Sequence, residues 1–247
     1  MLELIKGLRK EQPRGGLKKL RIDINIELEK RGYRPVGRDS LFEMARRNGL
    51  LLERRRSRKP VTTYSAHNYA VQPNLVKYIE ATAPGQVLVA DITYLTLRGG
   101  EHAYLFAVTD MYSRYIVGHY LSKSLGHAGA VQALEMACKN LPRDALTIHH
   151  TDRGVQYCCH EFLDKLCEFT MLSSMTDADH CAQNALAERV NGILKSEFYL
   201  DVTFNTFADA ARAVNNAIRI YNTRRRHWSL KLRIPAEVHF EGWRIAA

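Results

Sequence analysis

The chain has 247 residues, of which 46% are hydrophobic and 25% are charged, and these proportions are typical of a soluble globular protein. No apolar run approaches the roughly 18 residues that a membrane span requires. The first turn mixes Glu3, Lys6 and Arg9 among its leucines, which is unlike a signal peptide. We therefore expect one ordinary domain with a smaller one beside it, no membrane partner, and a chain that stays in the compartment where it is made.

The net charge of +10 is concentrated in one part of the chain. Residues 1–60 hold 18 Lys and Arg against 8 Asp and Glu, so the rest of the chain is neutral as a group. Residues 219–233 form a second basic stretch without any acid, and its members are Arg219, Arg224, Arg225, Arg226, Lys231 and Arg233. Such clusters indicate a polyanion partner, although a solvated basic surface explains a single cluster equally well.

The five cysteines are odd in number and show no Cys-x-x-Cys spacing, which favours reduced thiols over a disulfide framework. Zinc ligation is the functional interpretation of the adjacent Cys158, Cys159 and His160. Three adjacent side chains point in different directions, so ordinary partly buried residues are the favoured interpretation.

The first quarter of the chain has the pattern of short amphipathic helices. Between Leu17 and Leu28 apolar residues recur at steps of three and four, and a Gly- and Pro-containing break follows. Asp39 or Ser40 then caps a second predicted helix, whose outer side carries Arg46 and Arg47. Two short helices with many arginines favour a helix-turn-helix module that binds DNA, although other small helical hairpins fit the same pattern.

Composition divides the chain into four predicted segments. Residues 1–60 form a basic helical DNA-binding domain, and residues 61–85 form a linker, within a stretch from Arg54 to about Gly85 that is first basic and then polar. Residues 86–205 form an α/β domain, and residues 206–247 form a helical, basic C-terminal extension.

The α/β domain begins with an antiparallel meander and continues with alternating helices and strands. The predicted strands are residues 87–95, 103–109, 115–120, 147–151 and 170–172. Helices are predicted around residues 130–138, over 160–168, and through most of 184–222. These elements predict a mixed sheet, with parallel strands after the meander, flanked by helices.

Two aspartates lie where strands place functional groups. Asp91 interrupts the most apolar predicted strand, and an unpaired carboxylate buried there would cost several kcal/mol. Asp152 directly follows the fourth strand, at a carboxyl end where α/β sheets bind ligands. Each residue alone also fits a structural role at a sheet edge or turn.

Glu188 lies on the polar side of an amphipathic helix, together with Asn184, Asn191 and Lys195. A solvated polar face is the alternative for this helix alone. One carboxylate in a strand, one after a neighbouring strand and one on a following helix can converge on a hard cation such as Mg²⁺.

These residues occur within longer motifs that are specific as a set. Asp91-Ile92-Thr93-Tyr94 is followed by His150-Thr151-Asp152-Arg153-Gly154, and Asn184-Ala185-Leu186-Ala187-Glu188 comes next, with 35 residues between Asp152 and Glu188. Lys195 lies seven residues after Glu188, and Tyr221-Asn222-x-x-Arg225-x-His227 stands near the end. From about residue 86 to 240 the chain resembles the DDE transposases of bacterial insertion sequences, which are related to retroviral integrases. It is most similar to the downstream-frame protein of elements that encode their transposase in two overlapping frames.

The resemblance implies a ribonuclease-H-like catalytic domain in which Asp91, Asp152 and Glu188 are catalytic and hold two Mg²⁺ ions, with Mn²⁺ as a substitute. It implies cleavage of DNA ends and strand transfer in the bacterial cytoplasm, on double-stranded element ends and target DNA. A homo-oligomer on DNA and an upstream-frame partner protein are further implied partners. The expected DNA contacts are Arg46, Arg47, Arg54, Arg55, Arg56, Asn184, Lys195, Arg224, Arg225, Arg226 and His227.

Some positions depart from the family pattern, and two other functions stay open. Gln183 stands where the family commonly has Asp, and Thr151 stands where it usually has Ser. The alternatives are a ribonuclease-H-like nuclease that cuts without joining, and an inactive DNA-binding relic of a transposase.

Overall fold

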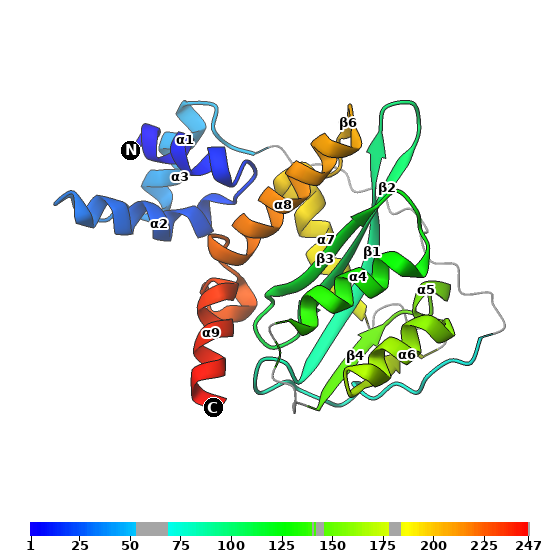
Figure 1. The fold of residues 1–247 in the computed structure, drawn as a ribbon. Coiled ribbons are helices and arrows are strands. Elements are labelled where there is room, and N and C mark those ends of the chain that lie inside the picture. Colours follow the sequence, from blue (N-terminus) through cyan, green and yellow to red (C-terminus); the bar gives the residue numbers. More distant parts are fainter. Residues whose placement is uncertain (53–68, 140, 142–145, 178–183, 247) are drawn as a thin grey trace.

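The structure, a computed structural model, describes residues 1–52, 69–139, 141, 146–177 and 184–246 (Figure 1). The expected DNA contacts Arg54, Arg55 and Arg56 and the departure at Gln183 lie outside these ranges. Within them, no helix has the length and apolar character needed to cross a membrane.

The N-terminal lobe consists of α1 (Leu2–Glu11), α2 (Leu17–Lys30) and α3 (Arg38–Arg47). These helices bury a hydrophobic cluster of their own, built around Ile5, Leu20, Ile24, Leu41 and Ala45. The predicted stripe along α2 therefore faces this lobe's core. The α3 helix begins earlier than expected, because Gly37 is its N-cap residue, and Asp39 and Ser40 lie in its first turn. The helix-turn-helix interpretation of the lobe stays a prediction.

One mixed sheet forms the centre of the α/β domain, and its main path has the order β3-β2-β1-β4-β5. The bounds are β1 (Val87–Leu97), β2 (His102–Asp110), β3 (Ile116–Ser122), β4 (Thr147–Thr151), β5 (Met171–Met175) and β6 (Thr203–Phe204). The β1, β2 and β3 strands pair antiparallel as predicted, and β4 and β5 continue the sheet with parallel pairing. The predicted antiparallel meander with parallel strands is confirmed.

Alternation along β1 assigns its side chains to two hydrophobic layers. Leu88 and Ala90 pack under α4 (His127–Cys138), α5 (Val155–Cys158) and α6 (His160–Glu168). Leu95 and Leu97 pack on the other face against α7 (Ala185–Phe198) and α8 (Phe207–Thr223). Because side chains alternate along a strand, Asp91 lies on the α7 face.

Two glycines allow α4 to lie close to the sheet. A Cβ at Gly118 of β3 would lie 2.1 Å from the Ala133 carbonyl oxygen, and one at Gly129 would lie 2.2 Å from the Phe106 ring. Helix and sheet therefore approach closely enough to fill the first layer without larger side chains at these positions.

The helical C-terminal stretch is interrupted where one continuous helical region was expected. The β6 strand separates α7 from α8 and pairs with the far end of β1. The α8 helix shares its hydrophobic cluster with α7 and β1, so it completes the core of the α/β domain.

Part of the expected linker packs against the sheet. The Leu75 backbone N–H donates to Ser174 Oγ at 2.9 Å, and the Met175 N–H donates to the Pro73 carbonyl at 3.4 Å. Val76 is buried beside Val87 and Val89. Residues 73–76 thus cover the end of β5.

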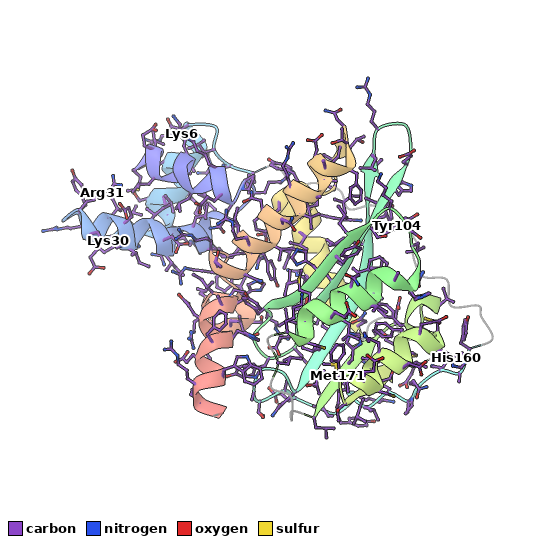
Figure 2. All side chains as sticks on the ribbon, in the orientation of Figure 1. Lys6, Lys30, Arg31, Tyr104, His160 and Met171 are labelled. Carbon is purple, nitrogen blue, oxygen red and sulfur yellow. The ribbon has the colours of Figure 1, made fainter. Side chains whose placement is uncertain are left out.

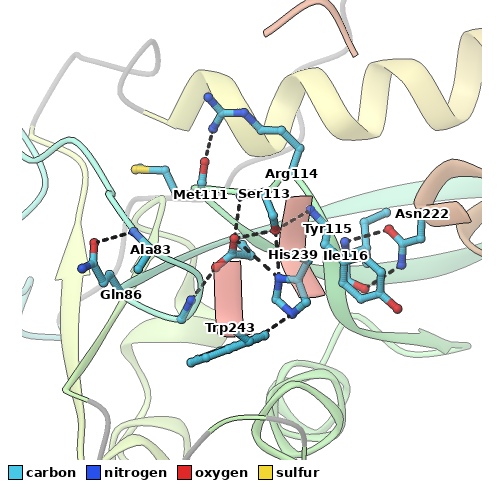
Figure 3. Close-up of polar contacts among 12 residues, drawn as sticks. Ala83, Gln86, Met111, Ser113, Arg114, Tyr115, Ile116, Asn222, His239 and Trp243 are labelled. Atoms are coloured by element: carbon cyan, nitrogen blue, oxygen red, sulfur yellow. Dashed lines mark hydrogen bonds and ion pairs between the residues drawn. The ribbon is translucent and has the colours of Figure 1, made fainter. Parts of the chain in front are cut away.

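The last helix, α9 (Pro235–Ala246), follows the short η2 turn (Trp228–Leu230) and is fastened to the sheet by a buried polar network (Figure 3). Trp243 Nε1 donates to His239 Nε2 at 3.1 Å, so the Nδ1–H of a neutral His239 donates to Ser113 Oγ at 2.9 Å. The Ser113 hydroxyl donates to Asp110 Oδ1 at 2.6 Å. Since the serine proton points to Asp110 and the group is buried, the network is structural.

Candidate active site

Parallel pairing of β1 with β4 aligns the two candidate aspartates. Val89 pairs with His150, and Asp91 and Asp152 each lie two residues further along the chain. Partners in register place their side chains on the same face of a sheet. Both carboxylates therefore lie on the α7 side, at the end of the β1–β4 ladder.

The α7 helix covers a stretch of the β1 edge that no strand pairs with in the described chain. The β4 ladder on this edge ends at Val89 and the β6 ladder begins at Thr96. In this gap Asn184 Nδ2 donates to the Ala90 carbonyl at 2.9 Å, and Asn191 Nδ2 donates to Asp91 Oδ2 at 2.9 Å. The polar side of α7 thus substitutes for a neighbouring strand, and the solvated-face alternative does not apply to its two buried asparagines.

The environment of Asp91 favours its protonated form. Burial first, and then the charges of Asp152 and Glu188, raise the pKa of Asp91, which reaches about 7 against opposing hydrogen bonds from Asn191 and from the Ile92 backbone N–H. The charges of both other predicted carboxylates therefore act on Asp91, which is partly buried, while Glu188 is exposed.

Around Asp152 the chain turns tightly and leads into α5. The Gly154 backbone N–H donates to Asp152 Oδ1 at 3.0 Å, which orients the carboxylate at the end of β4. Tyr157 is buried below, and its pKa is raised by burial and by the charges of Asp152 and Asp91. In β4 burial also lowers the pKa of His149 to about 3, so its imidazole is neutral.

The donor set fits a hard divalent cation. Its oxygen-only carboxylates repel one another and keep the pKa of Asp91 high, and a bound cation would relieve that repulsion. No sulfur or imidazole ligand belongs to the set, so Mg²⁺ or Mn²⁺ suits it better than Zn²⁺.

Lys195 lies on α7, the helix that also carries Glu188, and it is close enough to Asp91 to interact with its charge. Its Nζ lies 4.3 Å from the centre of the ring of Tyr94, which is three residues after Asp91 in β1. Burial lowers the pKa of Lys195, and Asp91 and Asp201 partly offset that shift. A half-buried cation beside the carboxylates is well placed to meet a DNA phosphate.

The C-terminal arginine cluster faces the N-terminal lobe. Arg225 Nη2 pairs with Glu197 Oε1 of α7 at 2.7 Å, and Lys19 Nζ of α2 pairs with the same oxygen at 3.1 Å. Arg226 Nη2 pairs with Asp23 Oδ1 at 2.8 Å, and Arg224 Nε lies 3.7 Å from Glu11 Oε2. The cluster therefore connects α8 to both α7 and the lobe.

Three of the expected DNA contacts are buried. Asn184, Arg225 and His227 are exposed by only 2%, 5% and 6%. Asn184 is committed to Ala90, and Arg225 Nη1 lies 2.8 Å from His227 Nε2 as well as binding Glu197. A DNA contact would require Arg225 and His227 to leave their internal partners, whereas Asn184 Oδ1 has no partner among the described residues, and the role of all three in DNA binding stays a prediction.

Two other expected contacts, Arg46 and Arg47, lie at the surface of α3. Arg46 and Arg47 are exposed and both pair with Glu43 on α3. Arg46 also lines an open groove between α2 and α3 together with Lys18 and Arg38. Lys6, Lys30 and Arg31 project from the same lobe (Figure 2), which leaves basic side chains available to a polyanion.

Sequence reasoning missed the roles of Asn191 and Glu197. Asn191 was recognised only as part of a polar helix face, although its three-residue spacing from Glu188 places it on the side of α7 that faces β1. Glu197 lies in the last turn of α7 and had no local signal, because its partners Lys19 and Arg225 are 178 and 28 residues away.

Comparisons with known proteins agree with this geometry. Residues 81–181 and 171–235 match two families that are both described as the integrase core domain. A 31 kDa protein of insertion element IS600 from Shigella sonnei is 35% identical over 218 residues, which cover 86% of this chain and 78% of that protein. The transposase InsF of insertion sequence IS3A from Escherichia coli (strain K12) is 34% identical and covers 81% of this chain and 69% of its own length.

Solved structures share the fold at lower identity. The HTLV-2 integrase catalytic core domain in complex with magnesium superposes with a TM-score of 0.52 at 17% identity, covering 65% of this chain and 99% of that one. A chain of the simian T-cell lymphotropic virus intasome in complex with the PP2A regulatory subunit B56 gamma gives a TM-score of 0.55 at 18% identity, covering 70% of this chain and 59% of that one.

The fold and these matches define an integrase-core enzyme, a DDE polynucleotidyl transferase. More particularly, the chain belongs to the IS3-type transposases of bacterial insertion sequences, which carry a retroviral-type integrase core. It catalyses transposition of an insertion sequence, and it acts on DNA.

Proposed function

We propose that Asp91, Asp152 and Glu188 form the catalytic centre, which cuts DNA at the ends of an insertion sequence and joins the freed ends to target DNA. The observation that carries this proposal is the register of β1 and β4, which sets Asp91 and Asp152 on one face of the sheet beside the helix that carries Glu188. Two Mg²⁺ ions held there, or Mn²⁺ in their place, would activate the attacking oxygen and stabilise the leaving oxygen.

The protein's own contribution is positioning. Asn191 and the Ile92 N–H hold both oxygens of Asp91, and the Gly154 N–H holds one oxygen of Asp152. In the first step a water oxygen attacks the phosphorus of the end phosphodiester and loses a proton to solvent. The bond from phosphorus to the 3′-oxygen breaks, and that oxygen takes up a proton, which leaves a 3′-hydroxyl on the element and a 5′-phosphate on the flanking DNA. In the second step that hydroxyl attacks a target phosphorus, and the bond to the target's 3′-oxygen breaks. Lys195 holds a backbone phosphate beside the scissile bond.

Double-stranded element ends and target DNA are the proposed substrates, and the basic lobe is the proposed end-binding domain. Since two ends are joined in one event, we propose that the chain works as a homo-oligomer on DNA. A protein from an upstream reading frame is a further proposed partner.

A strand-transfer assay on labelled element ends tests this proposal. The parent protein should yield joined products with Mg²⁺ or Mn²⁺ and none with chelator. Asp152→Asn and Glu188→Gln should each abolish cutting and joining while the protein stays folded, and the exposed Asp164→Asn should be fully active. Cut products without joining would indicate a nuclease, and a mobility shift alone would indicate an inactive relic.

A further inference from the structure

A second group of metal-ligating side chains lies on the opposite face of the sheet from the carboxylates. His127 is the first residue of α4, Cys159 is the N-cap of α6, and Glu161 lies in the first turn of α6. One ligand atom from each of these residues lies within 4.8 Å of the other two. We propose that His127, Cys159 and Glu161 bind a Zn²⁺ ion that joins the N-terminal ends of α4 and α6.

The donor chemistry selects zinc over the ions suited to the catalytic carboxylates. Imidazole nitrogen, thiolate sulfur and carboxylate oxygen are all ordinary zinc ligands, whereas Mg²⁺ takes oxygen ligands. Three protein ligands leave a fourth tetrahedral position for water. Binding forms a sulfur–zinc bond and releases the Cys159 thiol proton to solvent, so the charges balance without a redox step.

The geometry requires only local adjustment. The ligand atoms of a filled tetrahedral site lie about 3.5 Å apart, so the present spacing must contract by roughly 1 Å. Cys159 is buried, and its thiol donates to the Gln156 carbonyl at 3.5 Å, a bond that the metal would replace, whereas His127 and Glu161 lie nearer the surface. An adjoining open groove of about 330 Å³, lined in part by His127 and Glu161, leaves room for the fourth ligand.

Glu161 is available as a ligand because a neighbouring cation is committed to other acids. Lys165 lies in the same groove and pairs with Glu135 at 3.3 Å and with Glu168 at 2.7 Å. With Lys165 held by these two acids, the Glu161 carboxylate lies within 4.8 Å of the ligand atoms of His127 and Cys159.

This group differs from the three adjacent residues that suggested zinc in the sequence. Cys158 turns inward, where its Sγ lies 3.6 Å from Met175 Sδ, and His160 lies against the Tyr69 ring. The proposed site contains Glu161 and His127 instead of Cys158 and His160, and His127 comes from a different helix, α4. The side chains of Cys158, Cys159 and His160 therefore point in different directions, as the sequence predicts. Of the three, Cys159 lies beside the proposed ligands His127 and Glu161.

The site would brace the segment that carries Asp152. Only α5 separates Cys159 from the turn in which Gly154 orients Asp152, and Gln156 Nε2 in α5 donates to the Leu125 carbonyl near α4 at 3.0 Å. A metal ion that joins α4 and α6 would hold the end of α5 that lies away from Asp152. Zn²⁺ binding should therefore raise the midpoint of thermal unfolding.

Cobalt spectroscopy on the full-length protein tests the proposal. After chelation and dialysis, Co²⁺ is added in the presence of excess Mg²⁺. Co²⁺ at the catalytic carboxylates has only oxygen ligands, so a thiolate-to-cobalt charge-transfer band reports a cysteine site. We expect the band in the parent and in Asp152→Asn, which also separates this proposal from the catalytic one, since joining should fail in that variant while the band persists.

Matched cysteine variants assign the ligand. Cys159→Ser should abolish the band, and Cys167→Ser, which removes an exposed thiol from the same helix, should keep it. His127→Gln alters an exposed residue without disturbing the core, and it should weaken Zn²⁺ binding by more than roughly tenfold, since even an outer partner of a ligand is worth about that factor. A band that survives Cys159→Ser, the absence of a band in the parent, or unchanged Zn²⁺ affinity in His127→Gln would each overturn the proposal.

Discussion

The Asp91 side chain is held in a place that disfavours its charge. It lies in the central strand, beside two other carboxylates, and its pKa is raised to about 7 chiefly by burial. An acid with a raised folded pKa binds more protons in the folded state than in the unfolded state between the two pKa values. Its cost to stability therefore grows as the pH rises from about 4 to about 7, and is complete above that range.

Asp91→Asn should stabilise the metal-free protein in a pH-dependent manner. We expect the gain in the free energy of unfolding to grow by roughly 2–3 kcal/mol between pH 5 and pH 8, measured by urea denaturation in chelator. Asn191 can reverse its amide to accept from the new side chain, because its Oδ1 is buried without a partner. Added Mg²⁺ should stabilise the parent at pH 8 and not the variant, and Asp164→Asn serves as the control. An equal gain at both pH values would contradict the assigned electrostatic cost.

Lys195 offers a second test at the residue scale. Loss of its charge beside the carboxylates should weaken joining on element ends, and excess metal should not restore it because a lysine does not ligate Mg²⁺. Lys195→Ala should leave the fold intact, since the side chain contacts mainly the Tyr94 ring. The exposed Lys139→Ala provides the matched control. Joining within about twofold of the parent, which corresponds to roughly 0.4 kcal/mol, would show that Lys195 does not contact DNA.

At the scale of elements, α7 connects the proposed catalytic centre to the N-terminal lobe. Its first half carries Glu188 and Asn191, and its last turn carries Glu197, which binds Lys19 and Arg225. These two cations lower the pKa of Glu197 against the opposing effect of burial. The helix is thus fixed at one end by the sheet and at the other by the lobe.

Glu197→Gln should loosen this connection. Removal of the carboxylate leaves Arg225 and Lys19 enclosed without their counter-charge, and we expect a loss of roughly 1–3 kcal/mol in the free energy of unfolding, less than for a fully buried pair. Glu43→Gln is the control, because its pairs with Arg46 and Arg47 are exposed and should be worth under about 1 kcal/mol. The stabilisation by Glu197 should also fall as the pH drops through its lowered pKa. Equal effects of the two substitutions would show that Glu197 is not a structural link.

The helical period of α7 and the succession of strands along the chain could be predicted from the sequence, because both appear in the local pattern of apolar residues. The sequence could not show which element the polar face of α7 contacts. The burial of Asn191 depends on the gap between the β4 and β6 ladders along β1, and no local pattern records where a ladder ends. The sequence could single out the three carboxylates as candidates because each has its own local signal, at a strand centre, a strand end or a helix face.

At the scale of the whole molecule, the charge map of the sequence and that of the folded surface differ. The cluster at Arg224–Arg226 looked like a free basic patch, yet it meets Glu11, Asp23 and Glu197. Arg226 and Asp23 are 203 residues apart, so this neutralisation cannot be read from local composition. Among the residues that the structure describes, we therefore expect the lobe's exposed basic side chains to carry the electrostatic contact with DNA.

The groove between α2 and α3 is where that contact should be measured. It is lined by Lys18, Arg38 and Arg46, and also by Asp39 and Glu43, which pair with Arg38 and Arg46. A Lys18→Ala/Arg46→Ala double variant should bind element-end DNA more weakly and with a flatter dependence on salt. Each lost phosphate contact should reduce the slope of log affinity against log salt by roughly 0.9, because fewer counterions are released.

A control double variant removes the same number of charges from elsewhere. Lys123→Ala/Lys139→Ala changes two exposed lysines at the ends of β3 and α4, away from the lobe. Its slope should match the parent's if the groove binds the DNA backbone, because net charge is lowered equally in both variants. If the two double variants lose the same slope, the effect belongs to overall charge and the groove has no special part. If the groove variant keeps the parent's slope, its basic residues face solvent in the complex, and the binding surface lies elsewhere on the molecule.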